Sequence, residues 1–175
     1  RGAAHLYGSL DDAGSYTKNR FWILEPSGEG FAIKNAANGL YLSFESGVAV
    51  TSADAATWTL TQTKGFTWTQ TDVDAFAAAQ GLQISDGTYA LGMDSSPRSV
   101  VDVSGGSASN GANIQIYVSI NTAAQRWVIK NLLDSNGQPT GYVTIAHAGT
   151  SSVLDVTGGG KKSGNNVQQS AVNGT

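Results

Sequence analysis

The chain has 175 residues, 13% of them charged, with 22 glycines, no cysteine and a formal net charge of −3. The missing cysteines exclude disulfides, cysteine nucleophiles and Cys-based zinc sites, and two histidines are too few for a three-histidine zinc site. The slight acidic balance argues against nucleic acid and anionic membrane surfaces, and no apolar run is long enough to span a bilayer or form a signal peptide. A glycine-rich, weakly charged chain with spaced tryptophans is typical of an all-β protein with many turns.

The first third of the chain predicts a series of short strands. Apolar alternation indicates strands at 31–35 and 39–42, and tryptophan-containing strands at 20–23 and 57–60. Each of these tryptophans has apolar neighbours, so we expect it to pack in the core. Between 62 and 86 the pattern lapses, which indicates a connector whose helix formers begin after Asp72, a possible N-cap.

The second half contains an internal repeat. Residues 99–106 recur as 152–159, and the offset between Asp102 and Asp155 equals that between Gln115 and Gln168. Each copy predicts four short strands joined by turns, with a glycine pair after the aspartate strand and a third tryptophan strand at 125–129. The period of two places the valines that flank Asp102 in the core and sends the carboxylate outward.

The segment from Asp102 through Gln115 and Tyr117 to the Gln-x-Trp element at Gln125 resembles one repeat of the ricin-B-like lectins. The resemblance is good over 86–130, weaker elsewhere, and lacks the cysteines that many members carry. It implies an all-β fold of β-trefoil repeats, about three and a half of them here, incomplete at both ends. Such domains bind sugars in shallow pockets, so the implied partner is a glycan or polysaccharide and no cofactor is implied.

The resemblance also assigns roles to five residues. Asp102 is the acceptor for two sugar hydroxyls, and Tyr117 is the ring on which the apolar face of the sugar stacks. Gln115 and Gln125 match polar positions that line the pocket. The family often has Asn where this chain has an alanine, and Asn121 is nearby. The residue chemistry agrees, because a carboxylate forms charge-assisted bonds with hydroxyls and an aromatic ring offers an oriented apolar surface.

The other copies of the repeat match less well. Asp155 and Gln168 predict a weaker second site, since Ser170 replaces the stacking ring. In the first third, Tyr41 occupies the aspartate position, so that copy is expected to be structural. The alternatives are purely structural roles, in which Asp102 braces the glycine turn through an Asx-type bond and Tyr117 is an ordinary surface aromatic.

A catalytic role is not expected. Glycosidases need two carboxylates roughly 5 to 10 Å apart, whereas Asp102 and Asp155 occupy equivalent places in separate repeats. A calcium loop at 134–136 lacks the glutamate that it would need, so no metal site is predicted. The chain is therefore expected to be a non-catalytic carbohydrate-binding module, of the cysteine-free bacterial type, in a secreted or cell-surface protein. An accessory module of a larger enzyme is one form of this prediction. The alternative is a structural or protein-interaction trefoil that has lost sugar binding.

Two domain organisations fit these patterns. In the first, residues 1–61 end one module, 62–86 form a connector and 87–175 begin a second module, with further domains or repeats in the same parent chain. In the second, residues 1–175 form one permuted trefoil whose end segments combine. The residue pattern favours the first, because both ends interrupt a repeat.

Overall fold

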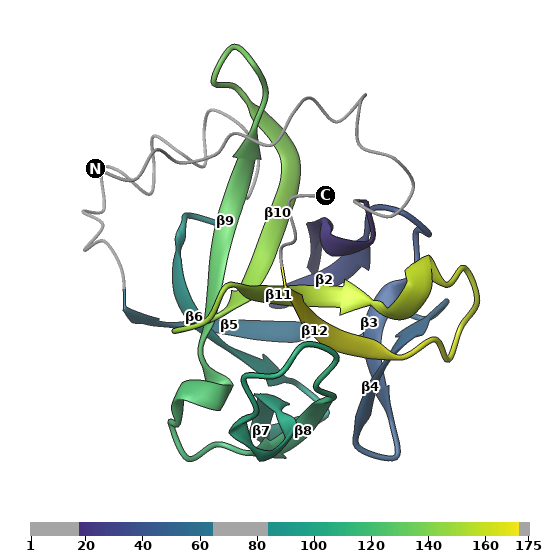
Figure 1. Cartoon of the computed structure of the whole chain (residues 1–175), viewed down its shortest axis with the longest axis vertical. Coiled ribbons are helices and arrows are strands. Elements are labelled where there is room, and N and C mark those ends of the chain that lie inside the picture. Colours follow the sequence, from purple (N-terminus) through teal and green to yellow (C-terminus); the bar gives the residue numbers. More distant parts are fainter. Residues whose placement is uncertain (1–17, 65–83, 172–175) are drawn as a thin grey trace.

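A computed structural model describes residues 18–64 and 84–171 (Figure 1). In this part of the chain the regular elements are β-strands and short 3₁₀ turns, and no helix is long and apolar enough to cross a membrane. The strands are β1 (Trp22–Ser27), β2 (Gly30–Asn35), β3 (Tyr41–Glu45), β4 (Val48–Ser52), β5 (Trp58–Lys64), β6 (Gly87–Met93), β7 (Ser96–Val103), β8 (Ile114–Val118), β9 (Trp127–Leu133), β10 (Pro139–His147), β11 (Ser152–Val156) and β12 (Val167–Ala171). The 3₁₀ turns are η1 (Lys18–Arg20), η2 (Ser104–Gly106), η3 (Ala123–Gln125) and η4 (Thr157–Gly159).

Six strands form a ring of antiparallel pairs. β1 pairs with β2, β2 with β5, β5 with β6, β6 with β9, and β9 with β10. β10 then pairs back to β1 through Trp22 and Val143, which brings together segments far apart in the sequence. Pairing in a ring leaves few free strand edges among these six strands.

The other six strands form three hairpins, β3–β4, β7–β8 and β11–β12. The hairpins also contact one another through single pairs. Val48 pairs with Gln115, Val50 with Asn166, and Asn113 with Gln168. Each hairpin is therefore held by its two counterparts as well as by its own ladder.

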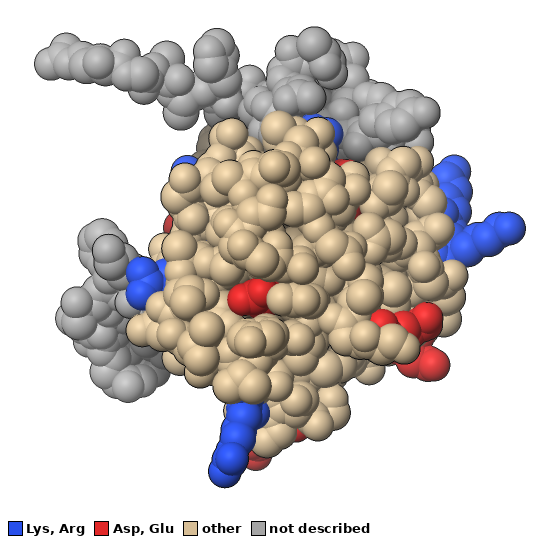
Figure 2. All heavy atoms as spheres, turned by 60° about the horizontal axis from the view of Figure 1, so that its bottom comes forward, with Lys and Arg blue, Asp and Glu red and all other residues tan. Residues whose placement is uncertain are grey.

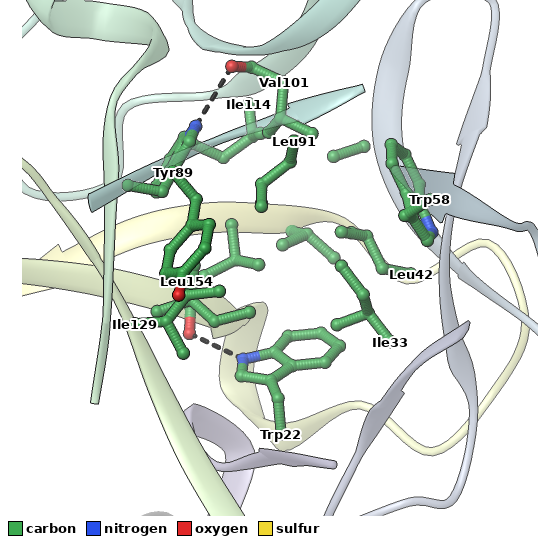
Figure 3. Close-up of a cluster of buried hydrophobic side chains, with 14 of the residues drawn as sticks. Trp22, Ile33, Leu42, Trp58, Tyr89, Leu91, Val101, Ile114, Ile129 and Leu154 are labelled. Atoms are coloured by element: carbon green, nitrogen blue, oxygen red, sulfur yellow. Dashed lines mark hydrogen bonds between the residues drawn. The ribbon is translucent and has the colours of Figure 1, made fainter. Parts of the chain in front are cut away.

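Three tryptophans anchor the core inside this arrangement, and Figure 3 labels two of them, Trp22 and Trp58. Trp22, Trp58 and Trp127 are all fully buried, as predicted from their apolar neighbours. The indole of Trp22 donates to the carbonyl of Leu154 at 3.1 Å, and that of Trp127 donates to the carbonyl of Val101 at 3.0 Å. These bonds join the tryptophan strands to β11 and β7, so the core also fixes the position of the two aspartate strands.

The local predictions agree with the structure at most positions. The expected strands at 31–35 and 152–156 are β2 and β11, and the glycine pairs form the turns η2 and η4. The polar turn after β9 is held by Asp134, whose carboxylate accepts two backbone N–H bonds at 2.8 Å. The helix expected after Asp72 and most of the predicted connector lie outside the described residues.

Candidate functional site

The β7–β8 hairpin carries the main predicted site residues. In its register, Asp102 pairs with Gln115 and Val100 pairs with Tyr117. The alternation of a strand buries Val101 and Val103 completely and sends Asp102 to the opposite face, as expected. The hairpin therefore presents an acid, an amide and a phenol near one another.

A glycine turn shapes the chain directly after Asp102. Within η2, Gly105 has a φ of +64° and Gly106 a φ of +61°, values that side chains with a Cβ adopt only with strain. A Cβ at Gly106 would lie 4.0 Å from the Cβ of Ala124, so the turn packs close to the loop that precedes Trp127. This close approach brings two loops together beside the hairpin.

Asp102, Gln115 and Tyr117 line one hollow with a volume of about 720 Å³. Its walls are formed by the glycine turn, by residues 120 and 122–124 of the loop before β9, and by the turn 147–150 between β10 and β11. The hairpin contributes both the acid and the ring, so the predicted constellation faces a common space. The turn 147–150 belongs to a different part of the chain and had no counterpart in the sequence prediction.

The carboxylate of Asp102 lies deeper than the sequence suggested. We expected an outward carboxylate, but the residue is only 5% exposed and thus forms part of the floor of the hollow. The side chain of Gln115 donates to Asp102 Oδ1 at 2.9 Å. Because an ionised carboxylate offers about four acceptor positions, this bond fixes its orientation and leaves capacity for further donors. Tyr117, in contrast, is 50% exposed.

The structure places Gln125 and Asn121 away from this group. Gln125 is 2% exposed, donates to the carbonyl of Val118 at 2.8 Å and accepts from the N–H of Ile120 at 2.9 Å. Its amide therefore holds the loop after β8 in shape. Asn121 has a φ of +56° and accepts two bonds from Arg126. Both residues line a separate hollow of about 710 Å³, and their role in sugar binding stays a prediction.

Gln169 was missed in the sequence analysis, and it braces two walls of the hollow. Its side chain is fully buried and donates to the carbonyls of Ser107 at 2.8 Å and Ser109 at 2.7 Å. Its Oε1 lies 3.0 Å from Nδ1 of His147. Because both amide hydrogens are used, Oε1 is the acceptor and His147 the donor. A residue of β12 thus ties the glycine turn to the turn 147–150. The only signal in the sequence was a second glutamine directly after Gln168, and its burial is visible only in the structure.

The position of His147 in the sequence, at the end of an apolar alternating segment, predicts an ordinary surface histidine, and this prediction is wrong. The residue is 4% exposed because its ring packs against Trp127, with ring centres 5.8 Å apart, and bonds to Gln169. It also lines the hollow. Its Nε2 is buried without a hydrogen-bond partner among the described residues.

The predicted second site has a different environment. Asp155 pairs with Gln168, as Asp102 pairs with Gln115, but Arg20 of η1 lies against it with Nε 3.4 Å from Oδ1. The guanidinium also donates to Ser170 at 3.3 Å. Burial raises the pKa of Asp155, while the charge of Arg20 and hydrogen bonds from Gln168 and Arg20 act in the opposite direction. Arg20 therefore occupies the contacts that a sugar hydroxyl would need here.

The diverged copy in the first third has Tyr41 at the aspartate position, so it has neither the open carboxylate of Asp102 nor the ion pair of Asp155. The hydroxyl of Tyr41 donates to Glu25 at 3.1 Å, and the ammonium of Lys34 lies 5.4 Å from the ring centre of Tyr41. Lys34 also bonds Glu25 at 3.1 Å. These contacts join β3 to β1 and β2, which fits the structural role predicted for this copy. Among the described residues, no group of three acidic or histidine side chains is placed to hold a metal ion.

Comparisons with known proteins address the family and the fold. A family model described as ricin-type beta-trefoil lectin domain-like matches residues 18–117 and 123–175. Among solved structures, the designed threefold-symmetric protein ThreeFoil is similar with a TM-score of 0.54 and 20% identity, covering 89% of this chain and 91% of that chain. A mosquitocidal holotoxin gives a TM-score of 0.42 and 12% identity, covering 88% of this chain and 28% of that chain. No curated protein matches this chain.

The family match covers most of the chain, including all three hairpins. The likeness to ThreeFoil shows the fold independently of sequence identity. Both agree with the resemblance carried by the Asp102 repeat. The chain belongs to the ricin-type β-trefoil lectin-like domain family, and its fold is all-β and β-trefoil-like.

Proposed function

We propose that this chain is a non-catalytic carbohydrate-binding module whose hollow at Asp102 holds one sugar unit. The observation that carries the proposal is that Asp102, Gln115 and Tyr117 line the same hollow. A pyranose presents hydroxyls at its edge and C–H groups on its face. The oriented carboxylate accepts from hydroxyls, and the exposed ring of Tyr117 takes the face.

The depth of the carboxylate supports a polar ligand. A buried carboxylate pays a large desolvation cost unless hydrogen-bond donors surround it. Gln115 supplies one donor at 2.9 Å, and adjacent sugar hydroxyls supply two more in the bound state. Because the hollow is open and holds one stacking ring, a single site binds weakly, and a parent protein gains affinity by presenting several sites.

The biological setting follows from the same chemistry. A weak glycan-binding module without a catalytic pair serves to hold a larger protein on a polysaccharide or cell-surface glycan. We therefore propose a secreted or cell-surface parent protein with further domains, which includes the case of an accessory module on a glycan-active enzyme. A bacterial origin fits the absence of cysteine.

For the domain organisation we favour one permuted trefoil over two partial modules. The support is the pairing of β1 with both β2 and β10, because it joins the start of the described chain to a strand near its end and completes the ring of six strands. The isolated chain should then be a stable monomer, as sedimentation or light scattering can measure. Two partial modules would expose unpaired strand edges and aggregate.

The test of the function is a screen of the full chain on a broad glycan array, followed by calorimetric titration with the best sugar. Tyr117→Ala should abolish detectable binding because the stacking surface is lost, and its circular dichroism should match that of the wild type. Tyr142→Ala is the matched control, since Tyr142 is half-buried on β10 and lines neither hollow. Silence of the wild type across the array, or equal binding by Tyr117→Ala, would contradict the proposal and favour a protein-interaction trefoil.

A further inference from the structure

The lining of the Asp102 hollow contains more apolar side chains than a plain sugar ring can contact. Besides the polar floor and Tyr117, five of its residues carry only a methyl or an aliphatic side chain. They are Ala108, Ile120, Ala123, Ala124 and Ala148. Ala124 is buried against the core, but the face of a single pyranose stacked on Tyr117 does not reach the exposed side chain of Ile120 as well.

Exposed apolar side chains are concentrated at the same place. Among the described residues, the large hydrophobic side chains that stay exposed are those of Tyr117 (50%), Val118 (56%), Ile120 (58%) and Leu133 (52%). Three of these four lie within four residues, and two of the three, Tyr117 and Ile120, line the hollow. Apolar side chains that remain exposed together mark a contact surface more often than isolated ones do.

The charge around the hollow favours an uncharged ligand. Its lining contains one acid, Asp102, and neither lysine nor arginine. The face shown in Figure 2, toward which the β7–β8 end of the molecule is turned, consists mostly of uncharged residues with a few acidic ones, and the basic side chains lie at its margins. An acidic sugar would meet the carboxylate of Asp102 without a compensating cation, which like-charge repulsion disfavours.

An apolar peptide fits this hollow less well than a sugar does. It would cover Asp102, which is already 5% exposed, without supplying the hydroxyl donors that compensate a desolvated carboxylate. A ligand that satisfies both parts of the lining needs adjacent hydroxyls at one edge and a small aliphatic group at another.

We propose that the hollow selects a neutral pyranose with a methyl-ended substituent, an acetamido group or the methyl of a 6-deoxy sugar, and that Ile120 is the residue that recognises this methyl group. The proposal rests on the carbohydrate-binding function proposed above. The acetamido and 6-deoxy sugars share the chemistry of one exposed methyl group on an otherwise polar ring.

The experiment compares matched pairs of sugars on the full chain. The methyl glycosides of N-acetylglucosamine and N-acetylgalactosamine are titrated against those of glucose and galactose, and 6-deoxygalactose against galactose. One extra methylene in an apolar pocket is worth about tenfold or more in discrimination, so we expect about five- to tenfold tighter binding for at least one methyl-bearing member. Saturation-transfer NMR should show its methyl protons receiving strong transfer from the protein.

Two variants separate recognition of the methyl group from general loss of binding. Ile120→Ser should reduce the preference to about twofold or less while the parent sugar still binds, because the aliphatic contact is lost. Val118→Ser is the matched control, since Val118 is equally exposed but does not line the hollow, and it should keep the preference.

Each outcome decides the proposal. Preference within the acetamido pairs or within the 6-deoxy pair supports it and identifies which source of the methyl group is recognised. Equal binding within every pair overturns it while leaving the carbohydrate-binding function intact. Binding of none of these sugars, or capture of an apolar peptide at Ile120 instead, overturns it, and silence across the glycan array overturns the carbohydrate-binding function as well.

Discussion

The hairpins β7–β8 and β11–β12 share a sequence frame but present different surfaces. In each, an aspartate pairs with a glutamine across the hairpin and a 3₁₀ turn with two positive-φ glycines follows. At Asp102 the glutamine orients the carboxylate and Tyr117 remains exposed above an open hollow. At Asp155 a serine, Ser170, occupies the position that corresponds to Tyr117, and Arg20 contacts both Asp155 and Ser170.

Besides the exchange of Tyr117 for Ser170, the two hairpins differ at one position just before the tryptophan strands. Gln125 precedes Trp127 by the same distance as Arg20 precedes Trp22. The amide of Gln125 is short and bonds the neighbouring backbone, which leaves the side chain of Asp102 hydrogen-bonded to Gln115 alone among the described residues. The longer, charged side chain of Arg20 reaches the acid instead. The equivalent aspartate thus either keeps acceptor positions open toward a hollow, as Asp102 does, or becomes half of an ion pair, as Asp155 does, depending on a residue from another strand.

The largest effect on stability is expected from removing Gln169, the brace of the hollow at Asp102. Gln169→Leu leaves the carbonyls of Ser107 and Ser109 and the ring of His147 without their partner. Since an unmade buried hydrogen bond costs about 1–3 kcal/mol, we expect a loss of about 3 kcal/mol in the free energy of unfolding, measured in urea. Hydrogen exchange should accelerate in 105–109 and 147–150.

A matched control lies on the same strand. Gln168→Leu changes the neighbouring residue, which faces Asp155, and should cost about 1 kcal/mol. It should leave sugar affinity at Asp102 unchanged, whereas the folded fraction of Gln169→Leu should bind more weakly. Equal sugar affinity of wild type and folded Gln169→Leu would show that the brace does not position the site.

The ion pair of Arg20 with Asp155 should contribute next most to stability, in a pH-dependent way. Arg20→Gln leaves Asp155 buried without a cation and should cost about 2 kcal/mol at pH 7, below the value for a fully buried pair because Arg20 is partly exposed. Burial already raises the pKa of Asp155, and removing Arg20 raises it further. Stability from a raised folded pKa is present at low pH and lost as pH rises through it.

The deficit of Arg20→Gln relative to the wild type should therefore be largest near pH 7 and shrink toward about pH 4, where the carboxyl becomes protonated. Urea unfolding at both pH values measures it. Lys34→Gln, which breaks the exposed pair with Glu25, should change stability little at either pH. A deficit of the same size at both pH values would mean that Arg20 acts through packing alone.

Substitutions in the two glycine turns should differ in their cost to stability by a smaller amount. Gly106→Ala and Gly159→Ala both place a Cβ at positive φ, which costs about 1–2 kcal/mol. At Gly159 the new Cβ would also come within 2.6 Å of Nδ2 of the buried Asn19, whereas at Gly106 the nearest atom, the Cβ of Ala124, is 4.0 Å away. Thermal unfolding should show Gly159→Ala about 1 kcal/mol less stable than Gly106→Ala. The reverse order would mean that Asn19 moves aside freely.

The weakest expected effect is a gain of binding. Combining Arg20→Gln with Ser170→Tyr supplies the site at Asp155 with the amide and the ring found around Asp102. Calorimetric titration should then resolve a second, weaker site in each chain, because the aspartate–glutamine pair and the glycine turn are shared with the first site. Ser170→Tyr alone should add none while Arg20 still occupies Asp155. An unchanged stoichiometry in the double variant would show that more than these two residues closes the second site.

Much of the local structure followed from short patterns in the sequence. Alternating apolar residues located the strands around Val101 and Leu154, and the glycine pairs located the turns. Recurring tryptophans with apolar neighbours identified the anchors of the core. These features were predictable because strand period, turn conformation and side-chain burial depend on residues within a few positions of one another.

The candidate site was predictable only in part. The repeat identified Asp102, Gln115 and Tyr117, which line one hollow, because all three belong to one hairpin with a regular register. The depth of Asp102 and the bracing by Gln169 depend on loops packed from other hairpins. Gln125 matched a sequence motif, but its amide is used by the backbone beside it.

By itself the sequence determined the strands, their inward faces and the hairpin frame that holds an acid opposite an amide. Only the tertiary structure decided which of the two frames remains open. Arg20 and Asp155 are far apart in the sequence, and they meet because β1 pairs with β10. Gln169 and Ser107 belong to different hairpins, and they meet because the hairpins contact one another. Such contacts leave no periodic trace in the sequence, because they depend on how distant strands pack and not on the spacing of neighbouring residues.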